Sequence, residues 1–131
     1  MDSRVYRCTL EVRGYELDSF GHVNNAVYLN YLEHARWKML NEEGITLEQI
    51  EKDQRWPVIS AIEIKYLRPL FMGETFEIRS RVLEHSRARF IIEQLLFRGE
   101  IAIAGAKVTC VIVDETGRPN ELPESYNKFW Q

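Results

Sequence analysis

The chain has 131 residues, of which 45% are hydrophobic and 28% are charged, and its formal net charge is -3. This length suits one domain with a substantial core, and the slight acidity gives no general reason to expect nucleic-acid binding. No apolar run approaches the roughly 20 residues that span a bilayer, and the N-terminus lacks the apolar segment of a signal peptide, so we expect a cytoplasmic protein.

The cysteine and histidine residues do not predict a metal centre. Cys8 and Cys110 lie far apart and match no metal-ligand spacing, and the three histidines are scattered. We therefore expect no metal and no redox cofactor. The two thiols are expected to be reduced and to lie in strands, with a disulfide between them as the alternative.

The first half of the chain predicts a strand, a loop and a long helix. Residues 4–13 have the composition of a strand, and the spacing changes to a helical one from residue 25 to about residue 43. Asn24 or Asn25 is a suitable N-cap, and Gly44 is a suitable terminator. The apolar positions at intervals of three and four are Tyr28, Leu29, Leu32, Ala35, Met39 and Leu40.

The second half predicts strands after a short helical turn within residues 45–56. Alternating or continuous apolar runs occupy residues 62–66, 76–82, 88–98 and 101–113, with turn residues between them. The order is therefore one strand, one long helix and about four antiparallel strands. This is an α+β layout in which the helix buries its apolar stripe on one sheet.

The most informative segment lies just before the predicted helix. Asp18 precedes Gly21 and the probable helix start by a few residues. Free N–H groups and the positive end of a helix dipole polarise a carbonyl, and a nearby carboxylate acts on that carbonyl as base or nucleophile. The alternative is that Asp18 only forms an Asx-type turn.

Two segments carry a resemblance to a known family. Residues 18–36 begin Asp-Ser-Phe-Gly-His-Val-Asn-Asn-Ala-Val-Tyr, and residues 66–74 are Tyr-Leu-Arg-Pro-Leu-Phe-Met-Gly-Glu. They resemble the hotdog-fold acyl-CoA thioesterases, in particular the hydroxybenzoyl-CoA thioesterase branch. The His-Val-Asn-Asn run is also similar to fatty-acyl thioesterases of the same fold. The resemblance implies one hotdog domain over residues 1–131, with about five antiparallel strands wrapped around one central helix. It also implies a homodimer or homotetramer with active sites at the subunit interface.

The resemblance implies a role for each residue near the helix start. Asp18 matches the catalytic carboxylate, and the backbone N–H at Asn25 matches the donor to the thioester carbonyl. Gly21 allows a tight turn or a close approach of substrate. His22 is the further catalytic candidate, because a His near this position has a role in the fatty-acyl relatives, although not in the closer branch.

The candidate substrate contacts fall into two groups. The first group lies near Asp18 and the second lies on a later turn, where the family meets the nucleotide end of CoA. These candidates are Phe20, Asn24 and Tyr28, and then Ser86, Arg87 and Arg89. Lys65 and Arg68 are further basic candidates. Glu33 and Arg36, three apart on the predicted helix, are expected to form an ion pair.

The resulting hypothesis is an acyl-CoA thioesterase of fatty acid metabolism, which releases a free acid and CoA. The alternatives are an acyl-carrier-protein (ACP) thioesterase and a non-catalytic hotdog module that binds an acyl ligand. A dehydratase of the same fold is a further alternative, which would need a His-centred site.

Overall fold

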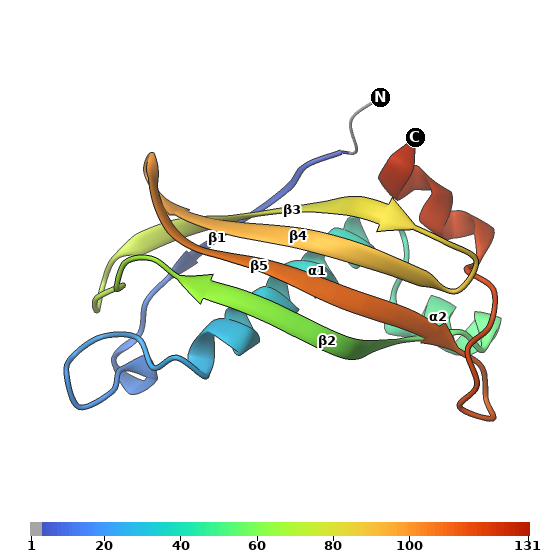
Figure 1. Cartoon of the computed structure of the whole chain (residues 1–131), viewed down its shortest axis with the longest axis horizontal. Helices are drawn as coiled ribbons and strands as arrows, with labels where there is room; N and C mark the ends of the chain where they lie inside the picture. Colours follow the sequence, from blue (N-terminus) through green and yellow to red (C-terminus); the bar gives the residue numbers. More distant parts are fainter. Residues whose placement is uncertain (1–3) are drawn as a thin grey trace.

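The computed structural model describes residues 4–131 and contains one five-stranded antiparallel sheet in the order β1-β3-β4-β5-β2. A long helix, α1 (Val27–Glu42), lies across one face of this sheet (Figure 1). The strands are β1 (Tyr6–Glu11), β2 (Trp56–Tyr66), β3 (Thr75–His85), β4 (Arg89–Arg98) and β5 (Ile101–Val113). The predicted strand, helix and four strands are therefore confirmed.

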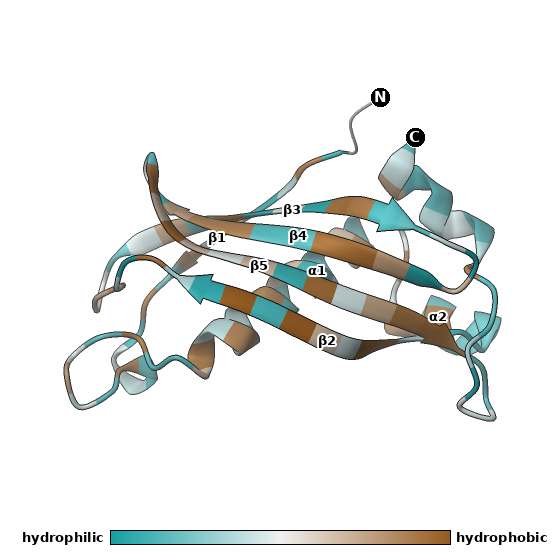
Figure 2. Cartoon of the chain, viewed as in Figure 1, coloured by the Kyte–Doolittle hydropathy of each residue, from teal (hydrophilic) through white to brown (hydrophobic). Residues whose placement is uncertain are grey.

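The strands form where side chains alternate between the core and the outer face. Burial alternates along β3 and β4, so that one residue in two faces α1. Hydrophobic and hydrophilic residues likewise alternate along β2 (Figure 2). On β5, Ala104 and Ala106 belong to the same core cluster as Tyr28 and Leu32 of α1. Their small side chains allow the helix to pack closely on the sheet.

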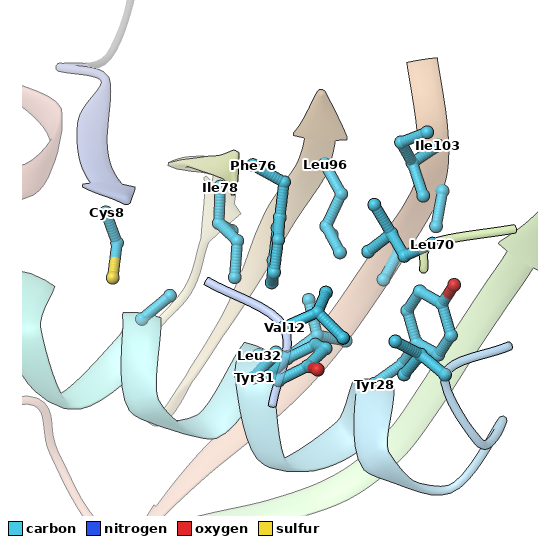
Figure 3. Close-up of a cluster of buried hydrophobic side chains, with 14 residues drawn as sticks. Cys8, Val12, Tyr28, Tyr31, Leu32, Leu70, Phe76, Ile78, Leu96 and Ile103 are labelled. Carbon is cyan, nitrogen blue, oxygen red and sulfur yellow. The ribbon is translucent and has the colours of Figure 1, made fainter. Parts of the chain in front are cut away.

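Helix α1 supplies the buried side chains that pack against the inner face of the sheet. Tyr28, Tyr31 and Leu32 point from the helix toward the sheet residues Phe76 and Leu96 (Figure 3). The helix begins two residues later than predicted. The reason is that the side-chain Oδ1 of Asn24 accepts a hydrogen bond from the Ala26 N–H and so stabilises a non-helical turn before residue 27.

Two shorter helical segments complete the fold. Helix α2 (Leu47–Asp53) begins at Thr46, whose hydroxyl accepts a hydrogen bond from the Gln49 N–H. The 3-10 helix η2 (Glu124–Trp130) buries Tyr126 and Phe129 against the end of the core. Among residues 4–131, no helix combines the length and hydropathy that crossing a membrane requires.

Strand β2 forms one edge of the sheet and is largely exposed. Within residues 4–131 it pairs with β5 alone, with a register shift between Ile59 and Ala61. Val58, Ile59 and Ile62 are between 36% and 42% exposed, although all three are apolar. An apolar edge strand is a surface on which another chain can pair.

Candidate active site

Asp18 begins a tight turn that fixes the direction of its carboxylate. Its N–H donates to the His22 carbonyl at 2.7 Å, and its carbonyl accepts from the Gly21 N–H at 3.1 Å. Its Oδ1 accepts from the N–H groups of Phe20 (2.9 Å) and His22 (3.2 Å). Gly21 has a φ of +79°, a left-handed conformation that favours glycine. The Asx-type turn that was the alternative interpretation of Asp18 is therefore present.

The same turn occurs a second time in the chain, after β5. Asp114 accepts at Oδ1 from the N–H groups of Thr116 (2.9 Å) and Arg118 (3.2 Å). The Gly117 N–H donates to the Asp114 carbonyl, and Gly117 has a φ of +81°. The Asp-x-x-Gly-x turn is thus a structural unit that does not by itself define a site.

The second carboxylate oxygen distinguishes the two turns. Oδ2 of Asp114 accepts a hydrogen bond of 3.1 Å from Asn120. Hydrogen bonds from Thr116 and Asn120 hold the pKa of Asp114 well below its usual range. Within the described part of the chain, Oδ2 of Asp18 has no hydrogen-bond partner. One carboxylate oxygen of Asp18 therefore holds the turn, while the other has no hydrogen bond among residues 4–131.

Asp18 is half-buried in the wall of a cleft of about 320 Å³. The residues that line the cleft come from the Asp18 turn, the start of α1, and the end of β2 with the loop that follows it. Its lining residues are Asp18, His22, Val23, Asn25, Tyr28, Tyr66, Leu67, Arg68 and Pro69.

The turn just before α1 contains a backbone N–H without an acceptor, and this N–H belongs to Asn25, which lines the cleft. The N–H groups of Ala26 and Val27 both donate to Asn24, to its side chain and its carbonyl respectively, at 2.9 Å. The N–H of Asn25 has no acceptor among residues 4–131. The Asn25 carbonyl accepts a hydrogen bond of 2.9 Å from the hydroxyl of Tyr66. This bond restrains the Asn25 peptide from the opposite wall of the cleft.

The other predicted residues near Asp18 have distinct surroundings. The His22 ring packs edge-on against Phe71, with ring centroids 5.0 Å apart. The Tyr28 ring contacts Tyr66 in the same way at 5.1 Å, and burial raises the pKa of Tyr28. Phe20 is 82% exposed at the tip of the turn and does not line the cleft.

The second predicted group of substrate contacts lies elsewhere. Ser86, Arg87 and Arg89 are at the β3–β4 turn, at the end of the sheet opposite to the Asp18 turn (Figure 1). Arg89 forms an ion pair of 3.7 Å with Glu84. Within one protomer, the fold does not bring these residues to the cleft.

The expected ion pair between Glu33 and Arg36 is not formed among residues 4–131. Arg36 is directed beneath the helix, where its Nη1 donates to Oε1 of Gln94 at 3.0 Å. Glu33 stays exposed at the surface. The three-residue spacing allows the pair, but the burial of Arg36 between helix and sheet keeps its guanidinium out of ion-pair distance from Glu33, which acts on it only through longer-range attraction.

The sequence did not indicate two residues that support the segments around the cleft. Tyr66 lies in the second motif segment, but only the fold brings its hydroxyl to Asn25. Glu16 is a carboxylate only 6% exposed, and it accepts hydrogen bonds from the Tyr31 hydroxyl (2.7 Å) and the Arg13 N–H (2.8 Å). No spacing in the sequence indicates that Glu16 is buried.

Comparisons with known proteins agree with this architecture. The family model of the Thioesterase-like superfamily matches residues 12–129. The acyl-acyl carrier protein thioesterase ATL3 of Arabidopsis thaliana is 36% identical over 94% of this chain, which spans 66% of that relative. The long-chain acyl-CoA thioesterase FadM of Escherichia coli is 33% identical, with 80% of each chain covered. The crystal structure of YbaW, a probable thioesterase from E. coli, is 28% identical, with a TM-score of 0.86 over 96% of this chain and 99% of that one.

The chain therefore belongs to the Thioesterase-like superfamily and has its hotdog fold. The fold expected from the resemblance, a five-stranded antiparallel sheet around one long helix, is confirmed. The sequence spans about two thirds of the length of the plant relatives that it matches.

Proposed function

We propose that this protein hydrolyses an acyl thioester at the Asp18 cleft, giving a free acid and a thiol. The observation that carries the proposal is the pair of unused groups in one cleft. Oδ2 of Asp18 and the N–H of Asn25 both lack a partner among residues 4–131, and both residues line the same cavity. The Asp18 carboxylate would act as base or nucleophile, and the Asn25 N–H would donate a hydrogen bond to the developing oxyanion.

The chemistry assigns a separate task to each group. The thioester carbonyl oxygen accepts a hydrogen bond from the Asn25 N–H at the helix start, which stabilises the negative charge that forms there. Asp18 either removes a proton from an attacking water or attacks the carbonyl carbon itself, and water then hydrolyses the acyl-enzyme. In both routes a C–O bond forms, the C–S bond breaks, and the thiolate takes up a proton.

The acyl carrier is either CoA or ACP. The names of the relatives include both, an acyl-acyl carrier protein thioesterase and a long-chain acyl-CoA thioesterase. Arg68 is exposed and is the Arg or Lys residue among the described residues that line the cleft. It would meet a phosphate of the pantetheine arm in either case.

We further propose that the working unit is a homodimer or homotetramer. The exposed apolar edge strand β2 supports this, because pairing of two such edges would cover Val58, Ile59 and Ile62. Antiparallel pairing would also bring the partner's β3–β4 turn toward the end of β2 that holds Tyr66. This is the arrangement in which Ser86, Arg87 and Arg89 would reach a substrate.

The test is hydrolysis of a panel of acyl groups, from short aliphatic to aromatic to long-chain, each presented on CoA and on ACP. Asp18→Asn preserves the Oδ1 acceptor and the turn, so we expect kcat/KM to fall about 100-fold or more without unfolding. Asp114→Asn changes the same turn at the far site and is expected to leave kcat/KM unchanged.

Two outcomes would contradict the proposal. Equal activity of Asp18→Asn and wild type would remove the catalytic assignment of Asp18. Absence of hydrolysis across the whole panel by wild type, with binding of acyl-CoA retained, would favour the non-catalytic acyl-binding module.

A further inference from the structure

Arg36 is a buried cation that forms no ion pair among residues 4–131. It is 7% exposed, and its recorded hydrogen bond among residues 4–131 goes to the neutral amide of Gln94. Gln94 is fully buried and donates to the Leu32 carbonyl (3.1 Å) and to Ser80 Oγ (3.0 Å). Burial of a guanidinium without a counter-ion is costly, and burial lowers the pKa of Arg36.

A neutral donor at this position would satisfy the Gln94 oxygen equally well. The hydrogen bond to Gln94 therefore explains a polar side chain but not a charged one. Glu33 lies one turn earlier on α1, yet it forms no ion pair with Arg36 and stays exposed. Attraction to Glu33 offsets part of the cost of burying Arg36, but no carboxylate among residues 4–131 is hydrogen-bonded to the guanidinium. An anionic ligand would supply that bond.

The Arg36 side chain lines a pocket between α1 and the first half of β2. This pocket has a volume of about 210 Å³ and shares no lining residue with the Asp18 cleft. The two cavities lie at opposite ends of β2. Apart from Arg36 and Glu33, the lining side chains are apolar or weakly polar, namely Trp37, Leu40, Pro57, Ile59, Phe90, Ile92 and Cys110.

The chemistry of this lining defines a ligand class. Pockets for drug-sized ligands measure roughly 300 Å³ or more, so this one suits a smaller molecule. A guanidinium pairs with a carboxylate through parallel hydrogen bonds, and apolar walls favour a hydrocarbon chain. We propose that the pocket binds a short aliphatic monocarboxylate, with its carboxylate on Arg36 and its chain between Trp37 and Ile59.

The proposal is independent of thioester hydrolysis, because the pocket is separate from the cleft and the test measures binding alone. The probe is hexanoate, with hexanamide as a neutral molecule of matched length. Titration calorimetry on the full chain should show hexanoate binding about tenfold more tightly than hexanamide, or better, because a charged hydrogen bond is lost with the amide. Carboxyl-labelled hexanoate should also stay ionised to lower pH when bound, because a guanidinium favours the carboxylate form.

Two variants localise the binding without altering Arg36, whose removal would leave the buried Oε1 of Gln94 without its donor. Ile59→Trp fills the pocket from a side chain that is 42% exposed, and it should abolish hexanoate binding. Ile62→Trp is the matched control, because Ile62 is 36% exposed in the single chain and lies on the same proposed dimer edge as Ile59, but does not line the pocket. It should bind hexanoate as wild type does.

A third variant tests the effect of the negative charge of Glu33, which lines the Arg36 pocket. Glu33→Gln removes the one carboxylate that lines the pocket, so it should tighten hexanoate binding at low salt and leave hexanamide binding unchanged. Equal affinity of wild type for hexanoate and hexanamide, or undiminished hexanoate binding by Ile59→Trp, would overturn the proposal.

Discussion

The hydroxyl of Tyr31 on α1 donates a hydrogen bond of 2.7 Å to Oε1 of Glu16, and both side chains are buried. Glu16 lies two residues before Asp18, and its carbonyl accepts a hydrogen bond from the Asn24 N–H. This contact therefore ties the chain on both sides of the Asp18 turn to the central helix. Burial and the neighbouring Glu16 carboxylate raise the pKa of Tyr31, so its hydroxyl remains a donor.

Tyr31→Phe is expected to lower the free energy of unfolding by about 1–3 kcal/mol, because a buried carboxylate oxygen loses a donor. Urea denaturation measures this change. Tyr15→Phe is the control, since the Tyr15 hydroxyl contacts Arg13 but the side chain is 80% exposed. If the two variants were equally stable, the Glu16 contact would have no structural importance.

The two Asp-x-x-Gly-x turns allow stability and activity to be separated. Gly21→Ala and Gly117→Ala each place a side chain at a left-handed φ with no atom nearby to clash. Each should destabilise the protein by about 1 kcal/mol, as measured by denaturation. Only Gly21→Ala should reduce thioester hydrolysis, because only that turn carries Asp18. A parallel loss of activity in Gly117→Ala would point to a general effect of stability.

Tyr66→Phe removes the hydroxyl that bonds to the Asn25 carbonyl and keeps the ring that contacts Tyr28. We expect kcat/KM to fall several-fold because the Asn25 peptide becomes less restrained. The melting temperature should change little, since Tyr66 is 47% exposed. Steady-state kinetics beside a thermal melt test both statements, and unchanged kcat/KM would exclude a positioning role for this hydroxyl.

Cys110 is expected to make the free energy of unfolding depend on pH in alkaline solution. Burial raises its pKa from 9.0 to about 11, so the unfolded thiol ionises at a lower pH than the folded one. The stability that the neutral buried thiol adds is fully present below pH 9 and is lost as the pH rises toward 11. Over this range the free energy of unfolding falls by at most about 1.4 kcal/mol per pH unit.

Urea denaturation of wild type and Cys110→Ala, both reduced, between pH 8 and pH 10.5 tests this expectation (roughly the window in which the unfolded thiol titrates). The variant should lose stability less steeply than wild type across this range. Identical slopes would show that the thiol titrates alike in the folded and unfolded chains.

The local pattern of residues determined the elements and the location of the candidate site. Helical spacing from Tyr28 to Leu40 and strand alternation after Pro57 are local properties, and burial on one face follows directly from them. The Asp18 turn could also be predicted from the sequence, because Asp followed by Gly three residues later strongly favours a turn. The second such turn, at Asp114, shows why the motif alone could not identify a catalytic carboxylate.

Only the tertiary structure decided which polar groups are used and which are left free. Tyr66 reaches Asn25 from a strand that begins more than thirty residues later in the chain, and Tyr31 reaches Glu16 across the loop. Arg36 likewise leaves its helical neighbour Glu33 for Gln94 on β4. Such pairings depend on how the helix lies on the sheet, because hydrogen-bond partners are selected by distance in space and not by spacing along the chain.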